Sequence, residues 1–122
     1  MKLTLTNLHP FLRPPLREWR QRTLRLARAL QSEPPRGCVP DLRELGVALL
    51  GDGRMAAMNW RHLRHCGPTD ILTFPYGLGR GEIFISLDTA ARQARAHRQT
   101  LEDEVILYLA HGLLHLAGLD DH

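Results

Sequence analysis

Four short stretches of the chain carry the apolar patterns of strands. In the first, Leu3 and Leu5 alternate with Thr4 and Thr6, which is the period of a half-buried strand. The other three stretches are apolar runs or alternate in the same way, at residues 45–51, 71–74 and 82–87. Within the last stretch, one face carries Ile83, Ile85 and Leu87. The pattern therefore predicts four strands, with a turn over residues 76–81 joining the last two.

Apolar residues at helical spacing occupy the segments between and after these strands. They predict helices over residues 15–31, 53–65 and 89–97, and a last helix from Thr100 to Gly118. On the first helix the apolar face consists of Leu16, Trp19, Leu26, Ala27 and Leu30. Pro15 suits the first position of that helix because its missing N–H has no partner there.

Polar residues at the helix starts predict the caps. Asp52 is placed to cap the second helix, and either Ser86 or Asp88 the third. Thr100, with Asp103 three residues later, resembles a capping arrangement for the last helix, although the usual partner is Glu or Gln.

Length and composition predict a single soluble domain over residues 1–122. A chain of 122 residues with 43% hydrophobic content buries roughly two-thirds of its unfolded surface. No run reaches the ~18 apolar residues of a membrane span, and prolines interrupt the N-terminal segment where a secretory signal would need an apolar core. Cys38 and Cys66 form no CxxC pair, which fits reduced thiols and a cytoplasmic location, with a single disulfide as the alternative.

The net charge of +3 is carried almost entirely by arginine, since Lys2 is the only lysine. Arginine's planar guanidinium suits phosphate recognition, although a genome-wide coding bias would give the same composition. Two predicted helices carry basic faces, made of Arg17, Arg22, Arg25 and Arg28 on the first and Arg92, Arg95 and Arg98 on the third. These faces are either solvated surfaces or RNA contacts, and charge alone does not choose between them.

The last dozen residues, HGLLHLAGLDDH, have the spacing of a metal site. His111 and His115 are four residues apart, so on a helix their side chains share one face and can chelate one ion. Gly118 can end that helix and turn the chain back. The candidates for a third ligand beyond the turn are Asp120, Asp121 and His122. Three protein ligands leave a tetrahedral ion one open position, which is typical of a catalytic site. The alternative is two histidines that share a face without binding metal.

Gly112 stands where the zinc-peptidase motif HExxH has its general-base Glu, so peptidase activity is not predicted. A glycine inside a helix costs about 1 kcal/mol relative to alanine, and its small size lets another group approach the backbone. Glu104 lies on the same helical stripe but about 10 Å from His111 along the axis, too far for a direct ligand. Its role is either a carboxylate near the helix N-terminus or a group that contacts a metal ligand or lines the substrate channel.

Three strings in the same order resemble the YbeY family of bacterial endoribonucleases, also called rRNA maturation factors. They are HGLLHLAGLDD at 111–121, PTDILTF at 68–74 and GEIFIS at 81–86. The resemblance implies an α+β fold with a mixed, roughly four-stranded sheet flanked by helices, and a Zn²⁺ site on the C-terminal helix and the following turn. It also implies single-strand-specific RNA cleavage in rRNA maturation and ribosome quality control.

The partners implied by the resemblance are single-stranded RNA, an rRNA precursor, the small ribosomal subunit and its assembly factors, with neither DNA nor a membrane. Family members usually continue past the last motif with further helical sequence. The chain is therefore expected to be truncated or unusually short.

Two positions depart from the family pattern. The family commonly has His ten residues after the first ligand, where this chain has Asp121 followed by His122. It also commonly has Arg four residues after a helical Asn; counting from Asn59, that position is Leu63, with Arg64 beside it. The second departure leaves the identity of the phosphate-contacting arginine open.

The resemblance thus gives a candidate site. Its predicted metal ligands are His111, His115 and Asp121, with His122 as the alternative third ligand. The predicted catalytic groups are a zinc-bound water and Arg64, with Arg61 as the alternative cation that steadies the phosphate. Either water or the ribose 2′-hydroxyl is the attacking group. The rival hypothesis is a non-catalytic ribosome-assembly protein with a structural zinc.

Overall fold

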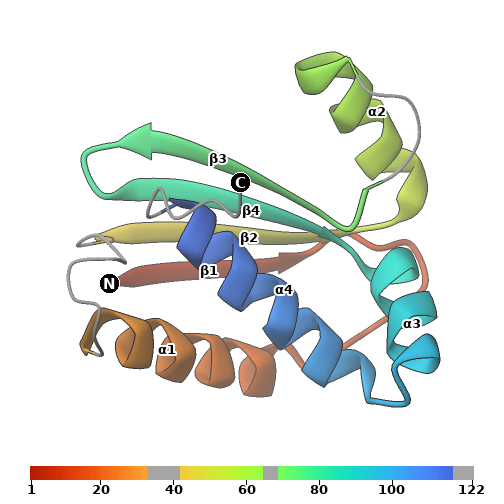
Figure 1. The fold of residues 1–122 in the computed structure, drawn as a ribbon, viewed down its shortest axis with the longest axis horizontal. Coiled ribbons are helices and arrows are strands. Elements are labelled where there is room, and N and C mark those ends of the chain that lie inside the picture. The colour runs from red at the N-terminus through yellow and green to blue at the C-terminus, as the bar shows by residue number, and fades with distance from the viewer. Residues whose placement is uncertain (33–41, 65–68, 117–122) are drawn as a thin grey trace.

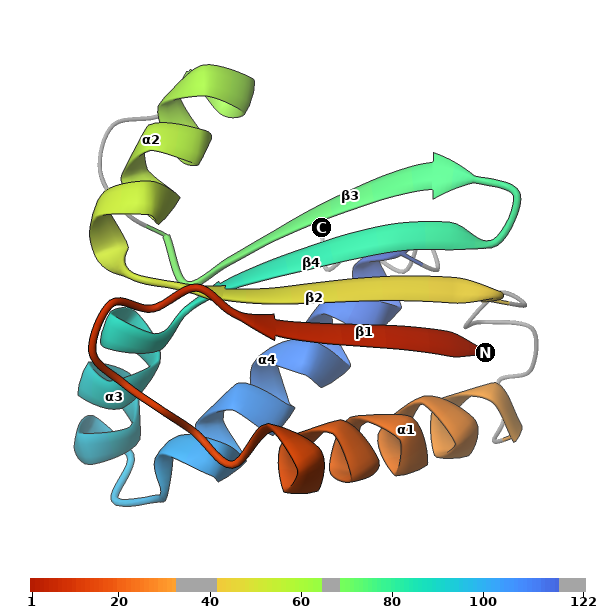
Figure 2. The same ribbon diagram turned by 180° about the vertical axis from the view of Figure 1, so that it is seen from behind.

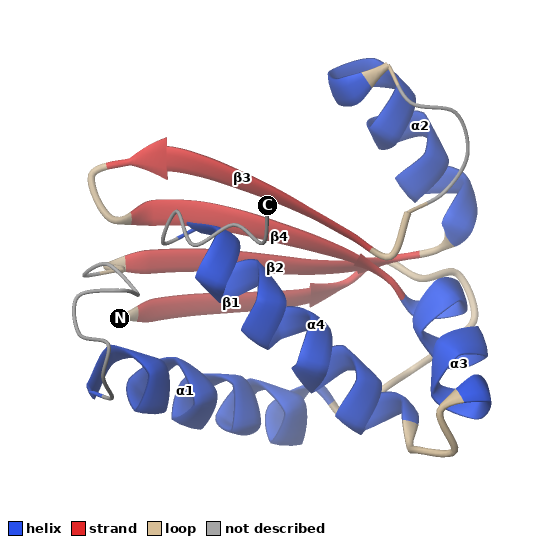
Figure 3. Ribbon diagram, in the orientation of Figure 1, coloured by secondary structure: helices blue, strands red, loops and turns tan. Residues whose placement is uncertain are grey.

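The fold, described from a computed structural model over residues 1–32, 42–64 and 69–116, consists of strands and helices around one mixed sheet (Figures 1 and 3). The elements in chain order are β1 Lys2–Asn7, α1 Leu16–Ser32, β2 Glu44–Leu50, α2 Asp52–Leu63, β3 Ile71–Gly77, β4 Arg80–Ser86, α3 Leu87–Ala96 and α4 Leu101–Leu116. Both the mixed four-stranded sheet and the flanking helices confirm the predicted α+β fold class.

The sheet has the order β1-β2-β4-β3, in which only β3 runs antiparallel to its neighbour. Leu5 lies opposite Val47, and Val47 lies opposite Ile83, so these three side chains share one face. Helices α1 and α4 cover this face and bury the main core against it (Figures 1 and 2). We call it the closed face.

The other face of the sheet is covered by α2 at one end only. Met55 of α2 packs there against Leu50 and Leu72 in a smaller apolar cluster. Further along the same face, Thr6 and Ala48 lie opposite each other and line a hollow of about 360 Å³. We call this side of the sheet the open face (Figure 2).

The turn between β3 and β4 is shorter than the predicted span of residues 76–81. The strands extend to Gly77 and from Arg80, with an irregular register between Pro75 and Gly77. Leu78 and Gly79 have φ values of 54° and 75°. Positive φ at both central residues is typical of the tight hairpin turns that match strand twist, and this lets the pairing continue to the end.

The helix caps confirm two predictions and correct a third. Ser86 accepts a hydrogen bond from the Thr89 N–H at 3.2 Å, and Thr100 accepts one from the Asp103 N–H at 3.1 Å. The prediction that Asp52 caps α2 was wrong, because Gly51 holds the cap position without a side-chain bond. Leu87, predicted to end a strand, instead begins α3 and is fully buried.

In the described ranges, no helix has the length and apolar character needed to cross a membrane. Cys38 and Cys66, the subject of the thiol prediction, lie outside the described residues.

Candidate functional site

His111 and His115 lie on α4, which runs without interruption from Leu101 to Leu116. Both histidines are exposed, and the unbroken helix keeps their side chains one turn apart on one face. Two imidazoles in this arrangement fit two ligand positions of a zinc ion. Over residues 1–32, 42–64 and 69–116, no group of three or more His, Cys, Asp or Glu side chains gathers to hold a metal. The predicted third ligands, Asp120, Asp121 and His122, lie outside these ranges with Gly118.

Gly112 allows α4 to lie close against the sheet. A Cβ atom at this position would come within 2.9 Å of Ile83 Cδ1 and 3.0 Å of Ile71 Cδ1, closer than carbon atoms pack. The same side of the helix buries Leu109 and Leu113. The glycine between the two histidines therefore serves helix packing, and that packing turns the histidine face toward solvent.

Glu104 is 1% exposed, and its side chain contacts the connection between α3 and α4. Its carboxylate accepts a hydrogen bond from Gln99 and lies 3.1 Å from Nδ1 of His97. Burial alone would raise the pKa of Glu104, but the hydrogen bonds from Gln99 and His97 outweigh burial and lower the pKa below its usual range. Because α4 is continuous, Glu104 cannot be a direct ligand beside His111. Its contacts secure the connection between α3 and α4.

Arg64, the predicted catalytic arginine, ends α2 in a left-handed conformation with φ of 59°. Its N–H donates to the Trp60 carbonyl at 3.0 Å, and its guanidinium lies 5.5 Å from the centre of the Trp60 ring. Helix α2 packs on the open face, whereas α4 packs on the closed face. Arg64 and the histidine pair therefore belong to helices on opposite faces of the sheet.

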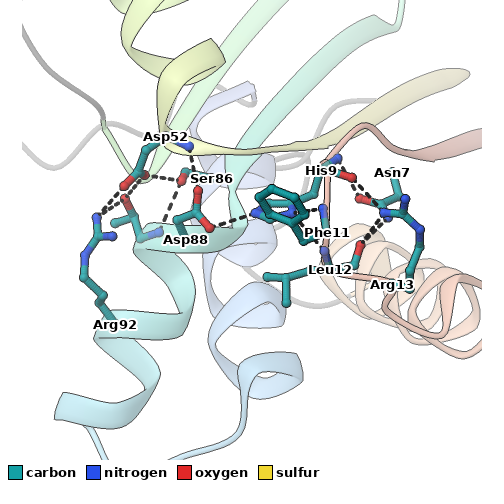
Figure 4. Close-up of polar contacts among 10 residues, drawn as sticks. Asn7, His9, Phe11, Leu12, Arg13, Asp52, Ser86, Asp88 and Arg92 are labelled. Carbon is teal, nitrogen blue, oxygen red and sulfur yellow. Dashed lines mark hydrogen bonds and ion pairs between the residues drawn. The ribbon is translucent and has the colours of Figure 1, made fainter.

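A polar network at the carboxyl ends of the parallel strands was missed by the sequence analysis (Figure 4). His9 is buried, and its Nδ1 accepts hydrogen bonds from the N–H groups of Phe11 and Leu12 at 3.0 and 2.9 Å. Its Nε2 therefore carries the proton and donates to Asp88 at 2.7 Å. Because both ring nitrogens are engaged, His9 is a structural histidine that fixes the segment after β1.

Asp88 and Asp52 continue the network between α2 and α3. The Asp52 carboxylate accepts hydrogen bonds from the hydroxyls of Ser86 and Thr89 at 2.6 and 2.8 Å and pairs with Arg92 at 2.9 Å. Partial burial would raise the pKa of each carboxyl, but the hydrogen bonds outweigh burial and lower the pKa of both Asp52 and Asp88. The capping signal at positions 86 and 88 marked this region, but nothing in the sequence linked it to His9.

Both predicted basic faces are partly engaged in ion pairs within the protein. Arg22 on α1 pairs with Glu102 at 2.7 Å and Asp103 at 2.8 Å on α4. Arg92 on α3 pairs with Asp52. These two arginines tie helices together and are less available to a nucleic acid than exposed arginines such as Arg17 and Arg28.

Comparison with known proteins places the chain in a family. Residues 13–122 match the family model described as "Endoribonuclease YbeY". An "Endoribonuclease YbeY" of Thermus thermophilus is 44% identical over 110 residues, covering 71% of this chain and 79% of the relative. One of Anaeromyxobacter dehalogenans is 36% identical over 126 residues, covering 98% of this chain and 61% of the relative.

A solution structure of a Thermotoga maritima protein shares the fold, with a TM-score of 0.61 and 22% identity over 98% of this chain and 75% of that one. The matched family model spans α1 to the end of the chain and so includes the histidine pair and the GEIFIS strand. The chain belongs to the YbeY endoribonuclease family.

Proposed function

We propose that this protein is a zinc-dependent, single-strand-specific endoribonuclease that acts in rRNA maturation and ribosome quality control. Family membership supports an endoribonuclease with an RNA substrate. The observation that carries the proposed zinc dependence is the exposed pair His111 and His115, one turn apart on a continuous helix.

In this proposal the imidazoles of His111 and His115 and the carboxylate of Asp121 hold the metal. When bound by these residues, zinc would supply Lewis acidity toward a water molecule and a phosphoryl oxygen. Because α2 and α4 pack on opposite faces of the sheet, Arg64 and Arg61 at α2 are proposed to hold phosphates of the RNA strand away from the metal. The attacking group is water or the ribose 2′-hydroxyl. End-group analysis of the product distinguishes them, since attack by the 2′-hydroxyl leaves a cyclic phosphate.

The alternative is a non-catalytic assembly protein in which zinc only stabilises the fold. The exposure of both histidines favours catalysis, because structural zinc sites are usually closed by four protein ligands. The small ribosomal subunit, its assembly factors and a cytoplasmic location belong to the proposal on either reading.

The test is cleavage of single-stranded RNA by highly purified protein, with zinc present and after its removal. We expect His111→Ala and His115→Ala each to abolish both zinc content and cleavage. Leu107→Ala is the matched control, because Leu107 is 41% exposed and lies one turn before His111 on the same helix face. Cleavage at an unchanged rate in His115→Ala would assign the activity to another site or to a contaminant. Zinc binding without cleavage in the native protein would favour the assembly role.

A further inference from the structure

Helix α2 and the open face of the sheet enclose a groove of about 310 Å³ that the proposed zinc site does not use. Its walls and floor include Leu8, Arg54, Met58, Arg61, His62 and Phe84. These residues line the face of the sheet on which α2 packs. That face is opposite to the one covered by α4 (Figure 2). Its volume is at the lower end of the range for sites that take small ligands, roughly 300–1,000 Å³.

The charge of this groove is positive. Arg54 and Arg61 lie seven residues apart, two helical turns, and so stand on the same side of α2. Both are exposed, and neither guanidinium group forms a hydrogen bond or ion pair with any residue that the structure describes. Among the described residues that line the groove, none is Asp or Glu. Two guanidinium groups flanking one groove suit an anion with oxygens at two places.

The floor of the groove is aromatic and apolar. The rings of Phe84 and Phe74 meet edge to face with centres 5.6 Å apart, and the ring of His62 meets Phe74 in the same way at 5.2 Å. Met58 lies in the same apolar cluster, and Leu8 at the rim is 42% exposed. Such a surface offers flat and polarisable contacts to a planar ring rather than hydrogen bonds to a peptide.

We propose that this groove binds a nucleotide unit of single-stranded RNA, with its base against Phe84 and Met58 and its flanking phosphates on Arg54 and Arg61. The combination of aromatic floor and paired cations is the one that sequence-tolerant binding of single strands requires. The inference rests on the proposed function and adds a substrate contact remote from the histidine pair. An RNA strand that reaches both has to pass from one face of the sheet to the other, and β3 is the edge strand next to β4.

The test measures binding of a fluorescent 2′-O-methyl oligouridylate, which resists attack by the neighbouring hydroxyl, using fluorescence anisotropy over a range of salt. The double variant Arg54→Gln/Arg61→Gln should weaken binding about tenfold or more, and the log–log salt slope should fall by about 1.4, because each phosphate contact contributes about 0.7. The charge-matched control is Arg17→Gln/Arg28→Gln, two exposed positions of α1. It should bind within about twofold of the native protein.

Base recognition is tested with an abasic oligonucleotide of the same length. If bases stack in the groove, the native protein should bind the abasic strand at least roughly fivefold more weakly. Equal affinity for the two strands would reduce the groove to a general anion site and overturn the proposal.

Photo-crosslinking of a 4-thiouridine oligonucleotide to the native protein gives a readout that needs no folded variant. Adducts are expected in residues 54–62 or at Phe84. If crosslinks fall on α1, or if the control variant loses affinity while the groove variant does not, the groove is excluded. RNA cleavage that still depends on His115 would then leave the proposed function standing. If the native protein bound no RNA, or bound acidic peptides as strongly as RNA, both the groove proposal and the proposed function would be excluded.

Discussion

The backbone N–H of Asp52 donates a 2.9 Å hydrogen bond to the carboxylate of Asp88, while the Asp52 carboxylate accepts hydrogen bonds from the hydroxyls of Ser86 and Thr89. Asp52 begins α2, and Asp88 lies in the first turn of α3. Each carboxylate thus accepts hydrogen bonds from the first turn, or the cap, of the other helix. Negative charge is favourable at a helix N-terminus because the N–H groups there have no partner within the helix. The two helices are fixed as a pair.

We expect Asp88→Ala to lower the free energy of unfolding by about 2 kcal/mol, because it removes bonds to both the Asp52 N–H and the buried His9 ring. Urea unfolding measures the change. Glu18→Ala is the control, since Glu18 is an exposed acidic residue in the first turn of α1. An equal loss in both variants would show that the effect is general helix electrostatics and not the exchange between α2 and α3.

Gly112→Ala should destabilise the protein although alanine is the better helix former. The gain in helix propensity is about 1 kcal/mol, whereas overpacking a core costs typically 1–3 kcal/mol. The added Cβ would lie 2.9 Å from Cδ1 of Ile83, so Gly112→Ala/Ile83→Val should recover part of the loss by removing that atom. Thermal unfolding of the single and double variants measures this coupling.

Gly53→Ala on α2 is the matched control for Gly112. Among the described residues, no atom lies within 4 Å of a Cβ added at Gly53. This change should therefore leave stability unchanged or raise it slightly. If Gly112→Ala were also stabilising, the close approach of α4 to the sheet would not restrict that position.

Glu104→Gln should lower stability by about 1–3 kcal/mol near neutral pH while leaving zinc content unchanged. The pKa of Glu104 in the folded protein lies below its usual value. The stabilisation by its carboxylate is therefore complete at pH values above the usual pKa, and it is lost as the pH falls through the folded pKa. The stability difference between native and variant should therefore be constant from about pH 5.5 to 7 and shrink below about pH 4. Unfolding curves across this range measure it.

A different outcome at Glu104 would assign it to the metal. If Glu104→Gln lost zinc while its stability matched the native protein, the carboxylate would act on the site and not on the connection between α3 and α4. Glu18→Gln provides the charge-matched control on another helix, at an exposed position.

The third metal ligand is decided by zinc content. We expect Asp121→Ala to lose zinc or bind it far more weakly and His122→Ala to retain it, because Asp121 holds the spacing at which the family commonly has its last His. Loss of zinc in His122→Ala alone would move the ligand by one residue. An Asp ligand also leaves the ion less positive than a neutral His does, so its coordinated water should be less acidic.

Strand positions were predictable because alternation reports directly on burial. The approximate bounds of all four strands follow from apolar positions such as Leu3, Val47 and Ile83, which the structure buries together. Alternation cannot show where a strand ends and a helix begins when the next residue would be buried in either element. Leu87 was assigned to a strand for that reason, since its side chain is buried equally well as the first residue of α3.

Contacts between distant segments were not predictable from local pattern. His9 and Asp88 are 79 residues apart, and no periodicity relates them. The histidine pair was visible because both histidines lie on one helix with a fixed geometric repeat. Arg54 gave no signal of its own, because its groove exists only where α2 meets the open face of the sheet.

The mixed sheet also orders the events of folding. Among the described strands, β3 and β4 are the one pair joined by a tight turn, so this hairpin closes with the smallest loss of chain entropy. Strand β1 gains its partner β2 only after α1 has intervened, and β2 gains β4 only after α2 and β3. Long-range parallel pairing is slow. We therefore expect the first strand to emerge during synthesis before it has a partner, and α4, with its histidines, to dock after the strands that it covers, because it follows them in the chain.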